Sequence, residues 1–142
     1  MRLVYSFLLA AIVGSVYPAV SAFPQEGGLS TEQVLEHHLQ AFGAGDVDAI
    51  VSDYSEEAVI FTPSGMVQGQ EDIRAAFETL VAEFSKPGMS FEMVEQQTKD
   101  EIAYIVWTAE TADNVYEFAT DTFVIRDGKI VYQSYSPKTE AR

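Results

Sequence analysis

Asp121 is the residue of this chain whose type and setting best suit acid–base chemistry. It lies between Ala119 and Phe123 in a predicted strand, with no lysine or arginine close by in sequence. Burial of a carboxyl group without a cationic partner raises its pKa, and such an acid can donate a proton to a bound carbonyl compound or accept one from it. The alternative is a structural acid that is hydrogen-bonded to a helix or to Tyr135.

His38 is the second candidate for a catalytic role. It shares an apolar stripe with Leu35, Leu39 and Phe42 at helical spacing. From there a histidine can donate a hydrogen bond or act as a base. The alternative is a histidine that fills space at the rim of the core. His37 is offset by about 100° around the helix and is expected to face solvent, so the adjacent pair does not indicate a metal site.

The charge and the cysteine content exclude several classes of function. The chain of 142 residues carries a net charge of −14, which repels nucleic-acid phosphates and anionic lipid headgroups. It contains no cysteine, so disulfides, thiolate catalysis and thiolate metal sites are excluded. Its length suits one domain, and we expect no cofactor and no metal.

Residues 1–22 have the pattern of a cleaved signal peptide. Arg2 precedes an apolar run that is shorter than the ~20 residues of a membrane span. Small residues at Val20 and Ala22 match a signal-peptidase site. We therefore expect an exported protein, periplasmic or secreted, with no membrane attachment after cleavage. A first strand or a membrane anchor is the alternative, and residues 23–29 are expected to form a flexible lead-in.

Apolar spacing predicts helices in the first half of the domain. Ser30-Thr-Glu-Gln33 indicates a capping box, and the helix that it begins is expected to end at Gly43-Ala-Gly45. Asp46 is expected to cap a second, shorter helix. A third helix is predicted over 70–84, where apolar residues recur at i, i+3, i+4 and i+7. A short strand over 58–62 precedes it.

The second half of the domain has the pattern of strands and turns. The predicted strands cover residues 91–98, 102–111, 115–125 and 130–135. Asp127-Gly128 is a hairpin signal between the last two. Helices followed by an antiparallel meander indicate an α+β fold with a curved sheet and helices on one face. The domain is expected to span 30–137, with a short tail over 138–142.

Three motifs resemble those of the NTF2-like superfamily, which includes nuclear transport factor 2, ketosteroid isomerase and the SnoaL-type cyclases. Ala41-Phe-Gly-Ala-Gly-Asp-Val-Asp-Ala-Ile50 is similar to the junction of the family's first two helices. Gly69-Gln-Glu-Asp-Ile-Arg-Ala-Ala-Phe77 resembles the start of its third helix, and Thr120-Asp-Thr-Phe-Val-Ile-Arg-Asp-Gly-Lys-Ile130 resembles its penultimate strand and hairpin. The resemblance implies a cone-shaped α+β fold, in which three N-terminal helices pack on a curved, mainly antiparallel sheet.

The resemblance also places a site inside the cone, between the helices and the concave face of the sheet. Alternation along the strands, counted from a turn at Ala112-Asp113, puts Tyr104 and Thr108 on the same face as Asp121. The residues expected to line a ligand there are Tyr54, Thr62, Tyr104, Thr108, Phe123, Gln133 and Tyr135, the last two by resemblance.

The same counting places apolar side chains on the opposite face, which the family commonly uses as a dimer contact. An apolar surface of this extent is unfavourable in water on a monomer. We therefore expect a symmetric homodimer that forms through the sheet. The side chains concerned are Trp107, Phe118, Val124 and Tyr132.

Resemblance to the superfamily's enzymes implies roles for three positions. Asp121 matches the ketosteroid isomerase aspartic acid that donates to the oxyanion, and the base of SnoaL-type cyclases. His38 stands where the isomerase has its oxyanion tyrosine. Thr62 stands where the isomerase has its proton-shuttling aspartate, and a threonine cannot relay a proton at neutral pH. The central part of a steroid-type isomerase is therefore missing.

We expect an exported SnoaL-like, NTF2-like protein that binds a small, largely apolar molecule in its cone. The first alternative is an isomerase, cyclase or dehydratase that uses Asp121 as acid or base, with His38 or Tyr135 as partner and no cofactor. The second is a non-catalytic, dimeric partner-binding module whose cone is filled by side chains. An open pocket that brings Asp121 and His38 within reach of one ligand atom favours the enzyme.

Overall fold

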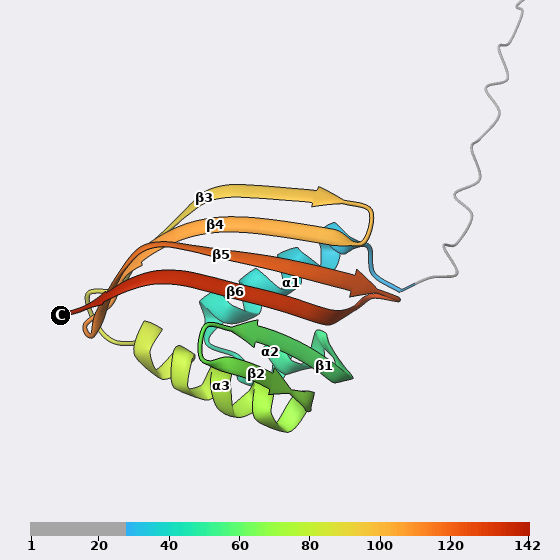
Figure 1. The fold of residues 1–142 in the computed structure, drawn as a ribbon, viewed down its shortest axis with the longest axis horizontal. Helices are drawn as coiled ribbons and strands as arrows, with labels where there is room; N and C mark the ends of the chain where they lie inside the picture. The colour runs from blue at the N-terminus through green and yellow to red at the C-terminus, as the bar shows by residue number, and fades with distance from the viewer. Residues whose placement is uncertain (1–27) are drawn as a thin grey trace, which may run out of the picture.

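The computed structural model describes residues 28–142, so the predicted signal peptide and most of the predicted lead-in lie outside the described residues. Helices and strands are mixed in the first half of this part of the chain, and strands make up the second half (Figure 1). The elements, in order, are α1 (Thr31–Ala44), α2 (Val47–Ser52), β1 (Tyr54–Thr62), β2 (Gly65–Gln68), α3 (Gly69–Phe84), β3 (Ser90–Lys99), β4 (Ile102–Glu110), β5 (Asn114–Arg126) and β6 (Lys129–Ala141).

Local signals in the sequence account for the ends of α1 and α2. The Gln33 N–H donates to the Ser30 hydroxyl at 3.3 Å, and the Ser30 N–H donates to the Gln33 side chain at 2.9 Å. Gly45 ends α1 with a φ of 69°, a left-handed conformation that glycine adopts without steric cost. The Asp46 carboxylate accepts from the Ala49 N–H at 3.0 Å and so caps α2. The predicted capping box and both predicted caps are confirmed.

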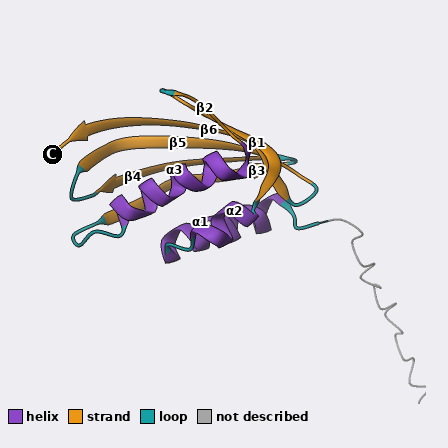
Figure 2. Cartoon of the chain, turned by 90° about the horizontal axis from the view of Figure 1, so that it is seen from below, coloured by secondary structure: helices purple, strands orange, loops and turns teal. Residues whose placement is uncertain are grey.

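A curved, mixed sheet of six strands carries the helices on one face. Its strand order is β2-β1-β6-β5-β4-β3, in which β1 and β6 are parallel and all other neighbours are antiparallel. Figure 2 shows the helices together on the concave side of this sheet. The predicted α+β class and the curvature of the sheet are confirmed. Across residues 28–142, no helix combines the length and the hydropathy of a membrane span.

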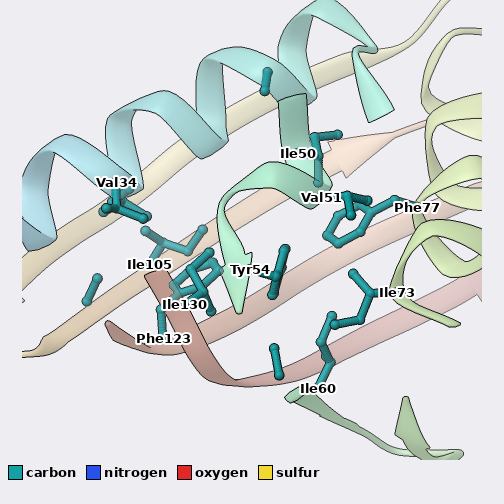
Figure 3. Close-up of a cluster of buried hydrophobic side chains, with 14 of the residues drawn as sticks. Val34, Ile50, Val51, Tyr54, Ile60, Ile73, Phe77, Ile105, Phe123 and Ile130 are labelled. Atoms are coloured by element: carbon teal, nitrogen blue, oxygen red, sulfur yellow. The ribbon is translucent and has the colours of Figure 1, made fainter. Parts of the chain in front are cut away.

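The hydrophobic core lies between the helices and the sheet (Figure 3). Val34 and Leu35 of α1, Ile73 of α3, and Phe123 and Ile130 of the sheet belong to this core and are at most 1% exposed. Burial of each such side chain contributes roughly 1.5–3 kcal/mol to the free energy of unfolding. This packing fixes α1 and α3 on the concave face, where they serve as walls of the space that the sheet encloses.

An extra residue in β5 changes which side chains face the helices. Trp107 of β4 pairs with Ala119 of β5, but Ala109 pairs with Tyr116 rather than with Glu117. The register of β5 against β6 shifts at the same place. The strand therefore contains a β-bulge over Glu117 and Phe118.

The bulge corrects the predicted orientation of β4. Counting from the turn without a bulge puts Tyr104 and Thr108 on the helix side and Trp107 on the outer side. In the structure Trp107 is buried on the helix side, and Tyr104 and Thr108 alternate with it on the outer face. The physical reason is that a shift of one residue in a strand turns over every side chain beyond it relative to its partner strand.

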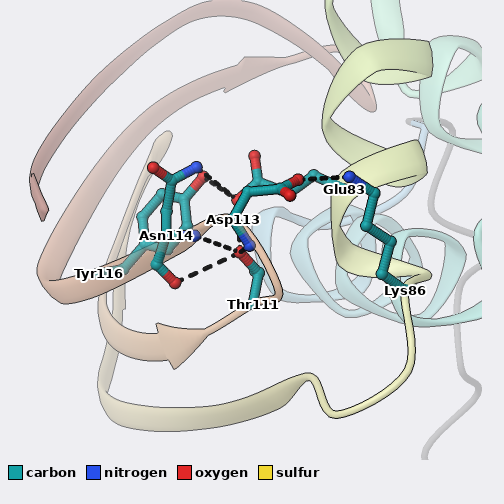
Figure 4. A network of polar contacts seen from close by, with 6 residues as sticks. All are labelled: Glu83, Lys86, Thr111, Asp113, Asn114 and Tyr116. Carbon is teal, nitrogen blue, oxygen red and sulfur yellow. Dashed lines mark hydrogen bonds and ion pairs between the residues drawn. The ribbon is translucent and has the colours of Figure 1, made fainter. Parts of the chain in front are cut away.

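The turn between β4 and β5 is tied to the C-terminal end of α3 by one carboxylate (Figure 4). Glu83 Oε1 accepts hydrogen bonds from Thr111 Oγ1 at 2.7 Å, Asn114 Nδ2 at 2.9 Å and Tyr116 OH at 3.1 Å. An ion pair between Lys86 Nζ and Asp113 Oδ2, at 2.5 Å, lies beside this network. Tyr116 is the last residue of β5 before the bulge that faces inward, so the network also holds the bulge in register.

Three parts of the sheet differ from the prediction. β1 begins at Tyr54, four residues before the strand predicted over 58–62. The four-residue strand β2 has no counterpart among the predicted strands. β6 continues through the residues expected to form a tail, because Ala141 pairs with Asn114 of β5. Pro137 lies beyond Ser134, the last β6 residue that pairs with β1. A proline is tolerated there because only one side of β6 is paired at that point.

Candidate functional site

A cavity of about 210 Å³ lies between the concave face of the sheet and the helices α1 and α3. Apolar side chains form most of its wall: Leu39, Phe42, Ile60, Val67, Ala76, Phe77, Leu80, Phe91, Ile105 and Phe123. The lining residues whose side chains contain polar atoms are His38, Thr62, Trp107, Asp121, Gln133 and Tyr135. An apolar enclosure with a few polar groups is typical of small-molecule sites.

Asp121 is the acid in this wall, and its residue surface is only 5% exposed. Its Oδ2 accepts a hydrogen bond from Trp107 Nε1 at 2.8 Å, and its Oδ1 accepts one from Gln133 Nε2 at 2.7 Å. Burial raises the pKa of the Asp121 carboxyl above its ordinary value, while the two hydrogen bonds and the nearby His38 act in the opposite direction and are outweighed. The carboxyl group therefore holds its proton more tightly than one in water does.

Tyr54 sets the orientation of the Gln133 amide. Its hydroxyl donates a buried hydrogen bond to Gln133 Oε1, so that Gln133 Nε2 is directed at Asp121. Burial raises the pKa of Tyr54 well above its ordinary value, which keeps the hydroxyl neutral. Tyr54 is itself 1% exposed and lies beneath the cavity wall rather than on it.

His38 faces the same cavity and lies among aromatic rings. The ring centroids of Tyr54, Phe77 and Phe123 lie 5.5, 5.7 and 5.5 Å from that of His38. His38 Nδ1 is 3.5 Å from Asp53 Oδ2, and neither of these buried atoms has a hydrogen-bond partner within residues 28–142. If this gap shortened to hydrogen-bond distance, the carboxylate would hold the proton on Nδ1 and leave Nε2 available to a ligand.

The Asp53 carboxylate lies close to both His37 and His38. The sequence does not predict this contact. His37, predicted to face solvent, has a side chain that is 47% exposed and places its Nδ1 2.7 Å from Asp53 Oδ1. Asp53 follows α2, and both histidines lie on α1, so the contact depends on how these helices pack. No local pattern in the sequence indicates it.

Trp107 and Tyr135 complete the polar part of the wall. Their rings are stacked, with centroids 6.3 Å apart and planes 9° apart. Burial raises the pKa of the Tyr135 hydroxyl above its ordinary value. Trp107 is the only tryptophan in the sequence, so its fluorescence reports on the surroundings of Asp121 alone.

The sequence profile of the SnoaL-like domain matches residues 35–133 of this chain. The chain belongs to the SnoaL-like domain family. The match includes every cavity residue that carries polar atoms except Tyr135. Among curated proteins, none matches the sequence of this SnoaL-like chain.

Solved structures share the fold of this SnoaL-like chain at low sequence identity. SalBIII, an epoxide hydrolase/cyclase-like enzyme described in pyran ring formation in the polyether salinomycin, superposes with a TM-score of 0.67 at 18% identity, over 79% of this chain and 95% of that one. A proposed ketosteroid isomerase from Kribbella flavida DSM 17836 gives 0.63 at 11% identity, over 79% of each chain. An NTF2-like protein of unknown function from Burkholderia xenovorans LB400 gives 0.63 at 23% identity, over 76% of this chain and 82% of that one.

Most residues predicted for the site lie on the cavity of this SnoaL-like domain. Asp121 and His38 both line it, together with Thr62, Phe123, Gln133 and Tyr135. Tyr54 reaches it only through Gln133. Tyr104 and Thr108 do not line it, because the bulge in β5 places them on the outer face. Over residues 28–142, no group of three histidine, aspartate or glutamate side chains is arranged to hold a metal ion.

Proposed function

We propose that this SnoaL-like protein binds one small, largely apolar molecule in the cavity, with a polar group of that molecule against Asp121. The observation that carries the proposal is a buried acid in an apolar wall whose two oxygens accept hydrogen bonds from neutral donors. In the protonated form of Asp121, the O–H group is a further donor at the cavity surface. A ligand carbonyl or hydroxyl oxygen is the acceptor that suits it.

The size of the cavity limits the ligand. A cavity of 150 Å³ in another protein binds benzene, so the cavity of about 210 Å³ suits roughly eight to ten non-hydrogen atoms. In a purely partner-binding module, the cone would be filled by its own side chains. A cavity of about 210 Å³ argues against that alternative.

Trp107 fluorescence provides the test. Titration with cyclohexanone, an apolar molecule with one carbonyl group, is expected to change the emission of Trp107 in a saturable way. Asp121→Asn is expected to weaken the affinity, because the ligand loses its carboxyl partner. Asp72→Asn is the matched control, since Asp72 is exposed on α3 and does not line this cavity. Titrations of the wild-type chain that show no saturable change, with cyclohexanone or with ligands extracted with the purified protein and identified by mass spectrometry, would contradict the proposal.

Acid–base catalysis on the bound molecule is the second candidate function. Two observations favour it: the raised pKa of Asp121, and the presence of His38 on the same cavity with Asp53 behind it. Asp121 would donate or accept the proton, and His38 would serve as the partner group. Isomerisation, cyclisation and dehydration of a carbonyl compound all fit this pair, and the fold is shared with SalBIII.

We also propose that two copies of the chain associate through the outer face of the sheet. Phe61 and Tyr132 stack there with ring centroids 6.5 Å apart, and both remain nearly half exposed. Phe118 at the bulge is 45% exposed on the same face. Trp107, predicted to belong to this surface, faces the cavity instead.

A further inference from the structure

A second cavity adjoins the first one at the C-terminal ends of α1 and α3. It has a volume of about 270 Å³ and opens beside the start of β3. Its own wall consists largely of small and flexible side chains, among them Gly43, Val81, Met89 and Met93. Asp121 and the other polar residues of the first cavity do not reach it.

Three side chains form the partition between the two cavities, because Leu39, Phe42 and Phe91 line both. The Phe42 ring lies 6.4 Å from that of Phe77 in the first cavity and 5.4 Å from that of Phe84 in the second. The two cavities therefore share part of their walls, and one ligand can occupy both only if Phe42 or Phe91 rotates.

We propose that the two cavities together hold one elongated ligand, a carbonyl compound with an unbranched alkyl tail. Its polar head lies against Asp121, and its tail passes Phe42 and Phe91 into the second cavity. This inference rests on the proposed function of the first cavity and adds to it the class of ligand.

The exposure of the second cavity supports an apolar tail as its occupant. Met89 is 41% exposed and Phe91 is 43% exposed, so a tail in the cavity would remove apolar surface from water. Methionine side chains are unbranched and flexible, and they adapt to chains of different length. Phe91 lies on β3, an edge strand that pairs only with β4, and its ring packs on Trp107 with the centroids 5.5 Å apart.

The length dependence of binding tests this proposal. The probes are the straight-chain 2-alkanones from 2-pentanone to 2-undecanone, with Trp107 fluorescence as the readout. Each methylene buried from water contributes about a fourfold gain in affinity. The wild-type chain is expected to show this gain along the whole series, because the longer members extend beyond the first cavity into the second.

Gly43→Leu adds a large side chain at a residue that lines the second cavity. A Cβ added at Gly43 meets no atom within 4 Å, and leucine favours the helix more than glycine does. In this variant the gain is expected to stop near 2-octanone, which leaves 2-undecanone bound about 60-fold more weakly than in the wild type (three methylenes at about fourfold each). Ala82→Leu is the matched control, because Ala82 is exposed on α3 and lines neither cavity.

Three results would overturn the inference. The first is a wild-type affinity that stops rising near 2-octanone, and the second is a Gly43→Leu variant with the full wild-type slope. The third is calorimetry that shows two molecules of a short ketone per chain, since the cavities would then be independent sites. Failure of every ketone to bind, the short ones included, would instead refute the proposed function of the first cavity and this inference with it.

Discussion

Both faces of the sheet are rich in apolar side chains, but they differ in their polar groups and in their exposure to solvent. On the inner face Asp121 is buried, and Trp107 and Gln133 donate to its two oxygens. On the outer face Phe61 and Tyr132 stack on each other and remain nearly half exposed. A buried acid with arranged donors is a setting in which the pKa of a functional group is shifted, whereas an exposed apolar surface is typical of contacts with other molecules.

The β5 bulge determines which side chains of β4 lie on each face of the sheet. Without the extra residue at Glu117 and Phe118, the count from the turn would place Trp107 on the outer face, where it could not donate to Asp121. One inserted residue therefore brings Trp107 to the inner face, where it donates to Asp121. The contrast between the faces can be tested on each side separately.

The largest effect is expected from Asp121→Asn on catalysis. Deuterium exchange at the carbons next to the carbonyl of cyclohexanone, followed by NMR, measures proton transfer directly. On the acid–base hypothesis the exchange rate falls by roughly 100-fold or more, because an amide cannot transfer the proton. The variant should fold, since the Gln133 amide and the Tyr54 hydroxyl can both reverse their roles to suit the new amide group. The acid–base hypothesis would be wrong if the wild type exchanged deuterium into cyclohexanone no faster than buffer does, or if the wild type and the variant gave equal rates.

On the outer face, Tyr132→Lys is expected to weaken the dimer. Both copies lose an aromatic ring and gain a charge at a symmetric interface, so the dissociation constant should rise at least about tenfold, which corresponds to about 1.4 kcal/mol. Sedimentation equilibrium measures it, with Thr79→Lys on the exposed side of α3 as the control. A wild-type chain that is monomeric at tens of micromolar, roughly where a standard-size interface should hold, would contradict the proposal.

The smallest expected effect is the pH dependence of stability that Asp121 contributes. Because burial raises the pKa of Asp121 above 3.8, the folded chain keeps this proton at pH values where the unfolded chain has lost it. The stability gained in this way is present below the unfolded pKa and is lost as pH rises through the folded pKa. Denaturant unfolding at a series of pH values measures this effect. As pH rises, the free energy of unfolding of the wild type should fall relative to that of Asp121→Asn, and above the folded pKa the difference between the two should stay constant. A difference that is flat throughout, or that rises with pH, would show that Asp121 is not held in its protonated form.

The sequence predicts those parts of the fold that depend on neighbouring residues. Ser30, Gly45 and Asp46 cap helices through atoms only a few residues away, and the apolar stripe of α3 is visible without knowing its partner. Strands β3 to β6 are also predicted within a few residues, apart from the C-terminal half of β6. β2 is missed because four residues are too few to show alternation, and its pairing with β1 is a contact that local sequence does not encode.

The candidate site was predictable only in part for the same reason. Asp121 and Phe123 face the cavity as expected, because both lie on the same side of the bulge. The orientation of Tyr104 and Thr108 depends on the register across the bulge, which the sequence of β4 does not contain. Asp53 became a candidate only through the packing of α2 against α1.

The Glu83 network is one of two anchors of α3. At the C-terminal end of the helix, the Glu83 carboxylate accepts from Thr111 in the β4–β5 turn and from Asn114 and Tyr116 at the start of β5. Near the other end, Gln70 Nε2 donates to the backbone oxygen of Tyr54 at 2.9 Å, and Arg74 pairs with Asp48. The residues of α3 that line the first cavity, Ala76, Phe77 and Leu80, lie between these anchors. That wall of the cavity is therefore supported at both ends.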